Sequence, residues 1–535
     1  MWVVPGAPLE GGGGWRIWYS QEGHADFQPQ PVTVTLAGQA QPTDQSWSPL
    51  PDLPELARRM GVLTVTIPVT RPGEVYEVSV PEAGLAEPFR WRSMPAVIGP
   101  EGVTFLLASC FWHNSDREGT YAAAVRFFTK QLGREWLPAF KLLVGDQIYG
   151  DWPPEKAENF GPVEYYAARY EEYWGDALYR EALQSTPNFF LCDDHEFWND
   201  YPERQIHLPR TWTEASRRDH GRAALEFYRR YQQCLNPGAN PWCQFTIGDT
   251  SLNVSLFLAD TRSQRDPFGT PAGAHFIQPP QWRALEQWVD GLTGPGVLIL
   301  GQPLFQKDGD WKDHSLSNFA DDYGRLWALI EKSLTGQNAQ RKRHDILVLS
   351  GDIHTGRFAT SRSADLGEQY GVPELIASAA SMIRPGSKEV EEPDYRFTVR
   401  FQGQSRVWKV DQDPGRAIPF MTLNSNVARV RMVPGTNGRV RFELSLWQTR
   451  PYDPRSWWDR LTGEAAFLGC FARTLVWIAT RQAVPGGDWH AEVLEDGTIR
   501  GDRAGAWKDP YHQGRAVLRC LEALPGPSPG AGGAS

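Results

Sequence analysis

Four apolar runs in this chain are each followed at once by side chains that can bind a metal ion. The runs are Val103–Ser109, Lys141–Val144, Asn188–Cys192 and Asp345–Ser350. In α/β sheets, the loops beyond the carboxyl ends of strands aim their side chains into a shared crevice. We therefore expect these four strand ends to meet at one edge of a sheet and to build a single metal site.

The first two strand ends supply a thiol, a carboxylate and a phenol. Cys110 follows the first run, although a lone cysteine there is more often a small buried hydrophobic residue than a ligand. After the second run, Gly145 permits a tight turn and Asp146 can bridge two cations with its two oxygens. Tyr149 lies three positions further on, within reach of the same centre. Each feature is common alone, so the prediction depends on their occurring together.

The other two strand ends carry acidic residues and histidines. The third run is followed without a break by Asp193, Asp194, His195 and Glu196. A solvated surface does not explain such a group directly after an apolar strand, so a functional role is favoured. After the fourth run, Asp352 and His354 stand two positions apart, and in an extended chain they would present an oxygen and an imidazole to the same side. The alternative is a structural histidine hydrogen-bonded in a turn.

The elements that must position these residues follow a change of pattern along the chain. Residues 1–98 predict a small antiparallel β-sandwich of the immunoglobulin or fibronectin III kind, because short alternating runs are separated by Gly, Pro and Asp. Those runs include Trp15–Tyr19, Pro31–Leu36, Val62–Val69 and Val75–Val80. From Val103 onward, apolar runs alternate with longer helical stretches, which predicts an α/β domain. The helical stretches are Tyr121–Leu132, Pro162–Leu183 and Arg217–Cys234.

Strands return after about residue 386 and could complete a second sheet. Val427–Met432 and Arg439–Trp447 predict a hairpin around a Pro-Gly-Thr-Asn-Gly turn. We assign residues 99–524 to one catalytic domain that includes these strands. The Pro, Gly, Ala and Ser of residues 525–535 predict a disordered tail.

Composition and charge exclude several classes of protein. With 41% hydrophobic and 22% charged residues the chain is an ordinary globular one, and a net charge of -10 argues against sequence-specific or coating binding of nucleic acid. Six scattered cysteines are too few for a disulfide framework in a chain of 535 residues. No stretch predicts a membrane span.

Taken together, the motifs resemble the signature of the PhoD-like alkaline phosphatases and phosphodiesterases, a family of the calcineurin-like superfamily. The matching motifs, in family order, are Ala-Ser-Cys ending at Cys110, Gly-Asp-x-x-Tyr at Gly145–Tyr149, Asp-Asp-His-Glu-x-x-Asn at Asp193–Asn199, and Gly-Asp-x-His at Gly351–His354. Weaker similar blocks are Asp260–Arg262 with Arg265, Gln278–Trp288 and Asp321–Arg325. The resemblance spans residues 103–385, and its specificity comes from the joint order of the motifs.

The resemblance implies a fold and a first metal. The fold is a four-layer αββα sandwich, in which helices flank two sheets behind the small β domain. The first ion of a dinuclear centre, implied to be ferric iron, would be held by Cys110, Asp146, Tyr149 and His354. Phenolate and thiolate ligands suit Fe(III).

The resemblance also implies a second, divalent ion that shares Asp146. Calcium suits its oxygen ligands, with zinc and manganese as alternatives. Those ligands would be Asp194, Asn199 and Asp352. Whether Asp193 or Asp194 binds stays open, and Asp194 is preferred because Asp194-His195-Glu196 resembles the Asn-His-Glu turn of the wider superfamily.

The activity implied is metal-dependent hydrolysis of phosphomonoesters, phosphodiesters or both, in small or polymeric substrates. A metal-bound hydroxide would attack in line, His195 would protonate the leaving group, and Arg262 would steady the phosphate oxygens. One alternative is a phospholipase or phosphodiesterase specialised for diesters. Another is a metal- or carbohydrate-binding protein that has lost catalysis.

Two features depart from the family pattern. Members typically carry a twin-arginine export signal, and none is visible at the start of this sequence, so we expect a cytoplasmic protein, with export of a mature form as the alternative. The arginine-rich segment Glu203–Arg222 resembles an insertion over the site, and its arginines would either clamp an anionic substrate or form a charged helix face.

Overall fold

The computed structural model describes most of the first 450 residues and divides into two compact units. It describes residues 1–450 except 86, 117, 132–136, 152–159, 206–207, 268–272, 308–314, 368, 382–393, 412–420 and 436–437, and it also describes 492–493 and 499–500. The first unit comprises Met1–Gly150, Tyr166–Pro202 and Ala224–Tyr452, and the second comprises Asp151–Tyr165, Glu203–Ala223 and Asp453–Ser535. The predicted tail at residues 525–535 lies outside the described residues.

The N-terminal part of the first unit consists of two four-stranded antiparallel sheets. The first has the order β1 (Trp2–Pro8), β2 (Gly14–Glu22), β6 (Arg58–Thr66), β5 (Asp44–Pro49), and the second β4 (Gln39–Ala40), β3 (Thr33–Leu36), β7 (Val75–Ser79), β8 (Phe89–Arg92). Alternate residues of β2, such as Trp15 and Ile17, enter a core shared with Val78 of β7, because successive side chains of a strand face opposite sides. The four strands predicted in this region are observed as β2, β3, β6 and β7.

Hydrogen bonds fasten these N-terminal sheets to the α/β part of the same unit. Trp18 Nε1 donates to the carbonyl of Arg230 over 2.8 Å. Asn188 Nδ2 donates to the carbonyl of Pro5 over 2.6 Å, so β1 is tied to the strand that begins at Asn188.

The smaller sheet of the α/β part has five strands. Its order is β11 (Asn188–Leu191), β10 (Lys141–Val144), β9 (Val103–Ala108), β21 (Ser425–Pro434), β22 (Val440–Arg450). The first three run parallel, and β21 pairs antiparallel with both β9 and β22. The predicted hairpin is therefore observed as β21 and β22, although residues 436–437 of its turn lie outside the described residues.

The larger sheet has nine strands among the described residues. Its order is β12 (Cys243–Gly248), β13 (Asn253–Leu258), β14 (Gly296–Ile299), β15 (Ile346–Ser350), β17 (Gly371–Ile376), β16 (Gly356–Arg362), β19 (Gln404–Asp411), β18 (Asp394–Phe401), and β20 (Met421–Thr422) also pairs with β16. Strands β13, β14, β15 and β17 run parallel. The strands beyond residue 386 thus complete both sheets and do not form one of their own.

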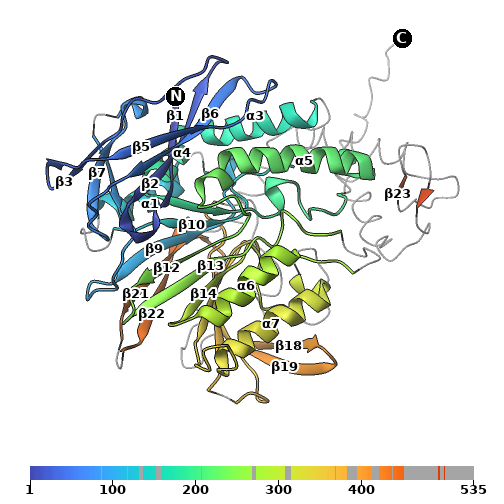
Figure 1. Ribbon diagram of the computed structural model, residues 1–535. Helices are drawn as coiled ribbons and strands as arrows, with labels where there is room; N and C mark the ends of the chain where they lie inside the picture. The colour runs from blue at the N-terminus through green and yellow to red at the C-terminus, as the bar shows by residue number, and fades with distance from the viewer. Residues whose placement is uncertain are drawn as a thin grey trace, which may run out of the picture. The chain divides into compact units, whose positions relative to one another are not determined.

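Two hydrophobic cores hold the α/β part together. One core combines Phe105 and Leu142 of the smaller sheet with Leu256 and Val297 of the larger sheet, so the two sheets share it. The other joins the larger sheet to α6 (Pro279–Gly291) and α7 (Ala320–Leu334) through residues such as Trp327. Figure 1 shows these two helices beside each other along β14. The predicted mixed α/β class is confirmed.

The remaining helices lie close to the predicted stretches. They are α1 (Thr120–Arg126), continued by a π-helical turn at Phe127–Gln131, α3 (Pro162–Gly175), α4 (Ala177–Gln184) and α5 (Glu214–Tyr231). The stretch predicted as one helix over Pro162–Leu183 breaks at Asp176, whose carboxylate accepts a hydrogen bond from Tyr179 N and caps α4.

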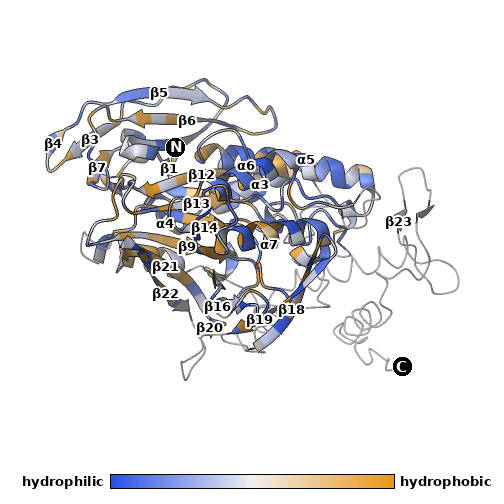
Figure 2. Ribbon diagram, turned by 60° about the horizontal axis from the view of Figure 1, so that its bottom comes forward, coloured by the Kyte–Doolittle hydropathy of each residue, from blue (hydrophilic) through white to orange (hydrophobic). Residues whose placement is uncertain are grey.

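Hydropathy follows this arrangement. In Figure 2 central strands such as β9 and β13 carry many hydrophobic residues, whereas α5 is largely hydrophilic. Among the described residues, no helix combines the length and the apolar character that crossing a bilayer requires.

Candidate metal centre

The structure brings the four predicted strand ends together. Ala380 N, which follows β17, donates to the Ser109 carbonyl at the end of β9 over 2.8 Å, so the edges of the two sheets meet here. Cys110 N donates to the Gly145 carbonyl over 3.2 Å, which links the ends of β9 and β10. Gly351 N donates to the Gly301 carbonyl over 3.1 Å, which links the ends of β15 and β14.

Two glycines of the motifs permit this close approach. Gly145 has a φ of 94°, and a Cβ there would lie 2.4 Å from the Cβ of Asp193. A Cβ on Gly351 would lie 2.5 Å from the side chain of Ser109. Because any larger residue would push the loops apart, the glycines of both Gly-Asp motifs are required by packing as well as by turn geometry.

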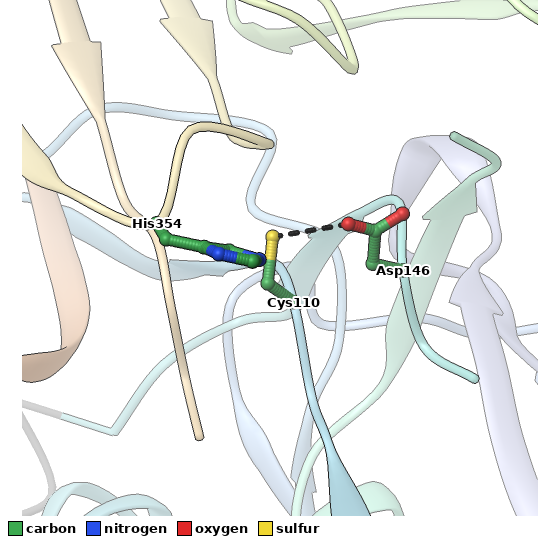
Figure 3. A group of neighbouring side chains, drawn as sticks. All are labelled: Cys110, Asp146 and His354. Carbon is green, nitrogen blue, oxygen red and sulfur yellow. Dashed lines mark hydrogen bonds between the residues drawn. The ribbon is translucent and has the colours of Figure 1, made fainter. Parts of the chain in front are cut away.

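The first group of candidate ligands is Cys110, Asp146 and His354. One donor atom from each lies within 4.8 Å of the others, and Figure 3 shows the three side chains meeting from separate loops. Cys110 Sγ donates to Asp146 Oδ2 over 3.2 Å. Tyr149 Oη lies 3.0 Å from His354 Nε2, so the phenol belongs to the same group. All four residues predicted for the first ion are therefore neighbours.

Two further groups share members with the first. Asp146, Asp194 and His195 form one, and Asp193, Asp194 and Asp352 form the other, by the same 4.8 Å criterion. Asp146 therefore belongs to two groups, as expected of a bridging carboxylate. Asp194 Oδ1 is buried and accepts no hydrogen bond from any described part of the chain, so this oxygen is available to a cation.

The backbone at the ligands is unusual. Cys110, Asp146, Asp352 and His354 have φ values of 57°, 55°, 69° and 54°, a left-handed region that nonglycine residues rarely adopt. Residues held in such conformations concentrate at functional sites because the surrounding structure must hold them there. The expectation of an extended chain at Asp352 and His354 was wrong. Both residues are left-handed, and their side chains join different ligand groups.

Burial sets the charge of the donors. Asp146 and Cys110 are fully buried, and burial is the main cause that raises the pKa of each well above its ordinary value. Burial likewise raises the pKa of the Tyr149 phenol. Bound cations reverse this effect by stabilising carboxylate, thiolate and phenolate. The donor set of thiol, phenol, imidazole and carboxylates, with its unbonded buried oxygen on Asp194, therefore fits a dinuclear metal centre.

Asp193 is engaged by residues from two other strand ends. Arg262 Nε donates to Asp193 Oδ1 over 2.7 Å, and the side chains are 0% and 1% exposed. Gln302 Nε2 also donates to Oδ1. Asp193 Oδ2 accepts no hydrogen bond within the described chain, yet only Asp194 belongs to two ligand groups. This geometry favours Asp194 as the ligand and Asp193 as the residue that anchors its loop.

Arg262 does not occupy the position that its predicted role requires. It is fully buried, and besides Asp193 it donates through Nη1 to the Tyr201 carbonyl over 2.8 Å. These contacts direct the guanidinium towards Asp193 and the Tyr201 backbone. The structure therefore favours a positioning role over the direct contact with phosphate oxygens that the sequence suggested.

Sequence reasoning assigned no role to Glu196, which the structure shows to be a central acceptor. Its carboxylate accepts hydrogen bonds from the backbone nitrogens of Asp146, Gln147 and Asp193 at 2.9, 2.6 and 2.8 Å. Burial raises its pKa to about 7. Glu196 thus joins the β10 and β11 loops. Its place in the acidic run was visible in the sequence, but its partners were not.

The remaining sequence candidates are placed as follows. Asn199 is half-buried, next to Asp200, whose backbone nitrogen donates to Asp194 Oδ2 over 2.8 Å. Within the Glu203–Arg222 segment, Arg218 and Arg222 form ion pairs with Glu214 and Asp219 of the same helix. These local pairs favour the interpretation of this segment as a charged helix face.

Replacing Gly150 with alanine is expected to displace the loop that carries His195. Gly150 N donates to the His195 carbonyl over 2.7 Å, and an added Cβ would lie 3.0 Å from that oxygen and 2.9 Å from the Phe197 carbonyl oxygen. Overpacking of this kind costs about 1 to 3 kcal/mol. We expect a lower melting temperature and weaker metal binding, measured by thermal unfolding and titration calorimetry.

Gly291→Ala is the matched control for this substitution. Beyond its own helix, no described heavy atom lies within 4 Å of a Cβ at Gly291, near the end of α6. It should be neutral or stabilising by about 0.4 to 1 kcal/mol. Equal effects of both substitutions would contradict the packing argument.

The fold and the site together describe an α/β protein with an acidic, multi-ligand metal centre at the meeting edge of two sheets. The family model of the PhoD-like phosphatases matches residues 105–416, which is more than half of the chain. A solved structure described as "Structure of PhoD" matches with a TM-score of 0.52 and 15% sequence identity, over 89% of this chain and 97% of that one. The chain therefore belongs to the PhoD-like phosphatase family, which is a family of phosphoesterases, and the predicted resemblance is confirmed.

Proposed function

We propose that this protein hydrolyses phosphate esters at a dinuclear metal centre. The observation that carries the proposal is the position of Asp146, which belongs to two neighbouring ligand groups. Cys110, Tyr149 and His354 would complete one ion's ligands, and Asp194, Asn199 and Asp352 the other's. When bound, the two ions would supply an activated water and would neutralise the phosphate charge.

The residues of the chain divide the remaining work. His195 is the proposed proton donor to the departing oxygen, because its backbone nitrogen donates to Asp146 Oδ1 over 3.3 Å and its ring lies 4.2 Å from the Tyr149 ring, between centroids. Glu196 and the Asp193–Arg262 pair hold the loops that present His195 and Asp194. These contacts support a geometry fixed before substrate arrives.

We also propose that the α/β part is a four-layer αββα sandwich behind an N-terminal β-sandwich at residues 1–98. The core shared by the two sheets, and the helices α6 and α7 packed on the larger sheet, support three of the layers. Contacts of α1 with α4 and with β22 support the fourth. The core common to the two N-terminal sheets supports the separate β-sandwich.

Elemental analysis and two model substrates test the proposed activity. The purified protein should contain two metal ions per chain and should hydrolyse p-nitrophenyl phosphate, bis(p-nitrophenyl) phosphate or both. Chelation should remove the activity, and added metal should restore it. Protein that contains no metal, binds none and turns over neither ester would contradict the proposal.

The identity of the first ion gives a spectroscopic prediction. If that ion is Fe(III), Tyr149 bound as a phenolate should give a visible charge-transfer band, whereas d¹⁰ zinc would give none. Tyr149→Phe should remove the band and leave the fold intact, because the ring and its packing remain. The measurement is the absorption spectrum, together with the iron content.

Tyr76→Phe is the control for this experiment. Tyr76 is also fully buried but belongs to the N-terminal core, so its replacement should leave the band unchanged. A colourless, active protein that contains zinc or manganese and no iron would disprove the iron assignment and spare the proposed hydrolysis.

A further inference from the structure

A buried ion pair lies in the larger sheet beside the metal centre. Arg357 Nη2 of β16 donates to Glu374 Oε2 of β17 over 2.9 Å, and the two side chains are 2% and 0% exposed. Removing two charges from water is costly, and an apolar pair of similar volume often stabilises a protein as well or better. The pair therefore calls for an explanation beyond stability.

The second carboxylate oxygen of Glu374 contacts two loops of the site. Glu374 Oε1 accepts hydrogen bonds from Leu304 N over 2.6 Å and from Ser350 Oγ over 3.3 Å. Ser350 is the last residue of β15, directly before Gly351 and Asp352. Leu304 follows β14, in the same loop as Gln302, which bonds to Asp193. Glu374 thus joins the loop of Asp352 to the loop that anchors Asp193.

Arg357 provides a second connection to the β14 loop. Its Nη1 donates to Tyr395 Oη over 3.2 Å, and Tyr395 Oη donates to the Phe305 carbonyl over 3.0 Å. Adjacent residues Leu304 and Phe305 are therefore held from two sides. A fully bonded polar network of this kind fixes one arrangement of its loops.

The arrangement that it fixes is a strained one. Asp352 and His354 have positive φ values, and such conformations persist only where neighbouring contacts impose them. Resting on the proposed dinuclear centre, we propose that Glu374, paired with Arg357, is a positioning residue that holds the β15 loop in its metal-binding conformation. It does not touch the ions or the substrate. It acts through Ser350 and through the β14 loop.

The test is titration of metal-free full-length protein with Mn²⁺ by calorimetry, alongside thermal unfolding. Outer residues that orient metal ligands typically contribute about 10- to 100-fold to affinity. We expect Glu374→Gln to weaken Mn²⁺ binding about tenfold. The double variant Arg357→Met with Glu374→Leu leaves neither charge unpaired, so it should fold, and it should bind Mn²⁺ at least as weakly because Leu304 N and Ser350 lose their acceptor.

A core substitution of similar stability cost separates positioning from general destabilisation. Val78 is fully buried in the N-terminal core, so Val78→Ala should lower the melting temperature and leave Mn²⁺ affinity unchanged. Wild-type affinity in either Glu374 variant, or an equal loss in Val78→Ala, would overturn the inference. If the wild-type protein binds no Mn²⁺, Ca²⁺, Zn²⁺ or iron, the proposed dinuclear centre itself is wrong, and the inference is rejected with it.

Discussion

Asp146→Ala is expected to abolish hydrolysis and to remove both metal ions. Asp146 is fully buried, lies in two ligand groups, and also accepts hydrogen bonds from Cys110 Sγ and His195 N. One carboxylate thus serves both ions, and no neighbour can replace it. We expect kcat/KM to fall at least about 1,000-fold, which corresponds to about 4 kcal/mol of lost transition-state stabilisation.

Metal content measured by elemental analysis makes this prediction specific. The variant should contain neither ion while it keeps its secondary structure, because removal of one buried carboxylate also relieves repulsion among Asp146, Asp193 and Asp194. Asp26→Ala is a matched control, since Asp26 is 99% exposed, in the N-terminal region. Normal turnover with two bound ions in Asp146→Ala would disprove the shared-ligand assignment.

His195→Ala should produce a loss that depends on the leaving group. General acid catalysis contributes about 100- to 10,000-fold where the departing oxygen needs a proton. Alkyl phosphate esters, whose alkoxide is a poor leaving group, should lose rate in that range. Esters of p-nitrophenol should lose far less, because nitrophenolate departs without protonation. The measurement is kcat for a series of esters whose leaving groups differ in pKa.

Two results would change the assignment of His195. Equal losses for all leaving groups would indicate a metal ligand or a structural role, which is a real alternative because His195 shares a candidate ligand group with Asp146 and Asp194. Loss of metal from the variant would indicate the first of these roles. His24→Ala, at an exposed histidine of the N-terminal region, should leave every substrate unaffected.

The sequence by itself determined which residues meet at the site. Cys110, Asp146, Tyr149, Asp194 and His354 each follow a buried strand within a few positions, and strands of a sheet end at a common edge. The ligand types and the strands that carry them are therefore local properties of the chain. For the same reason, the predicted strands of the N-terminal region and the hairpin of β21 and β22 were recognisable from alternation alone.

Only the tertiary structure decided what each polar residue contacts. Arg262 bonds to Asp193 across 69 positions and Glu374 to Leu304 across 70 positions, so both pairings depend on strand order and packing, which spacing in the sequence does not encode. Arg262 was therefore predicted to meet phosphate but lies buried beside a carboxylate. The conformation of Asp352 and His354 was also beyond the sequence. Their left-handed backbone is unfavourable locally and is imposed by the loops packed around it.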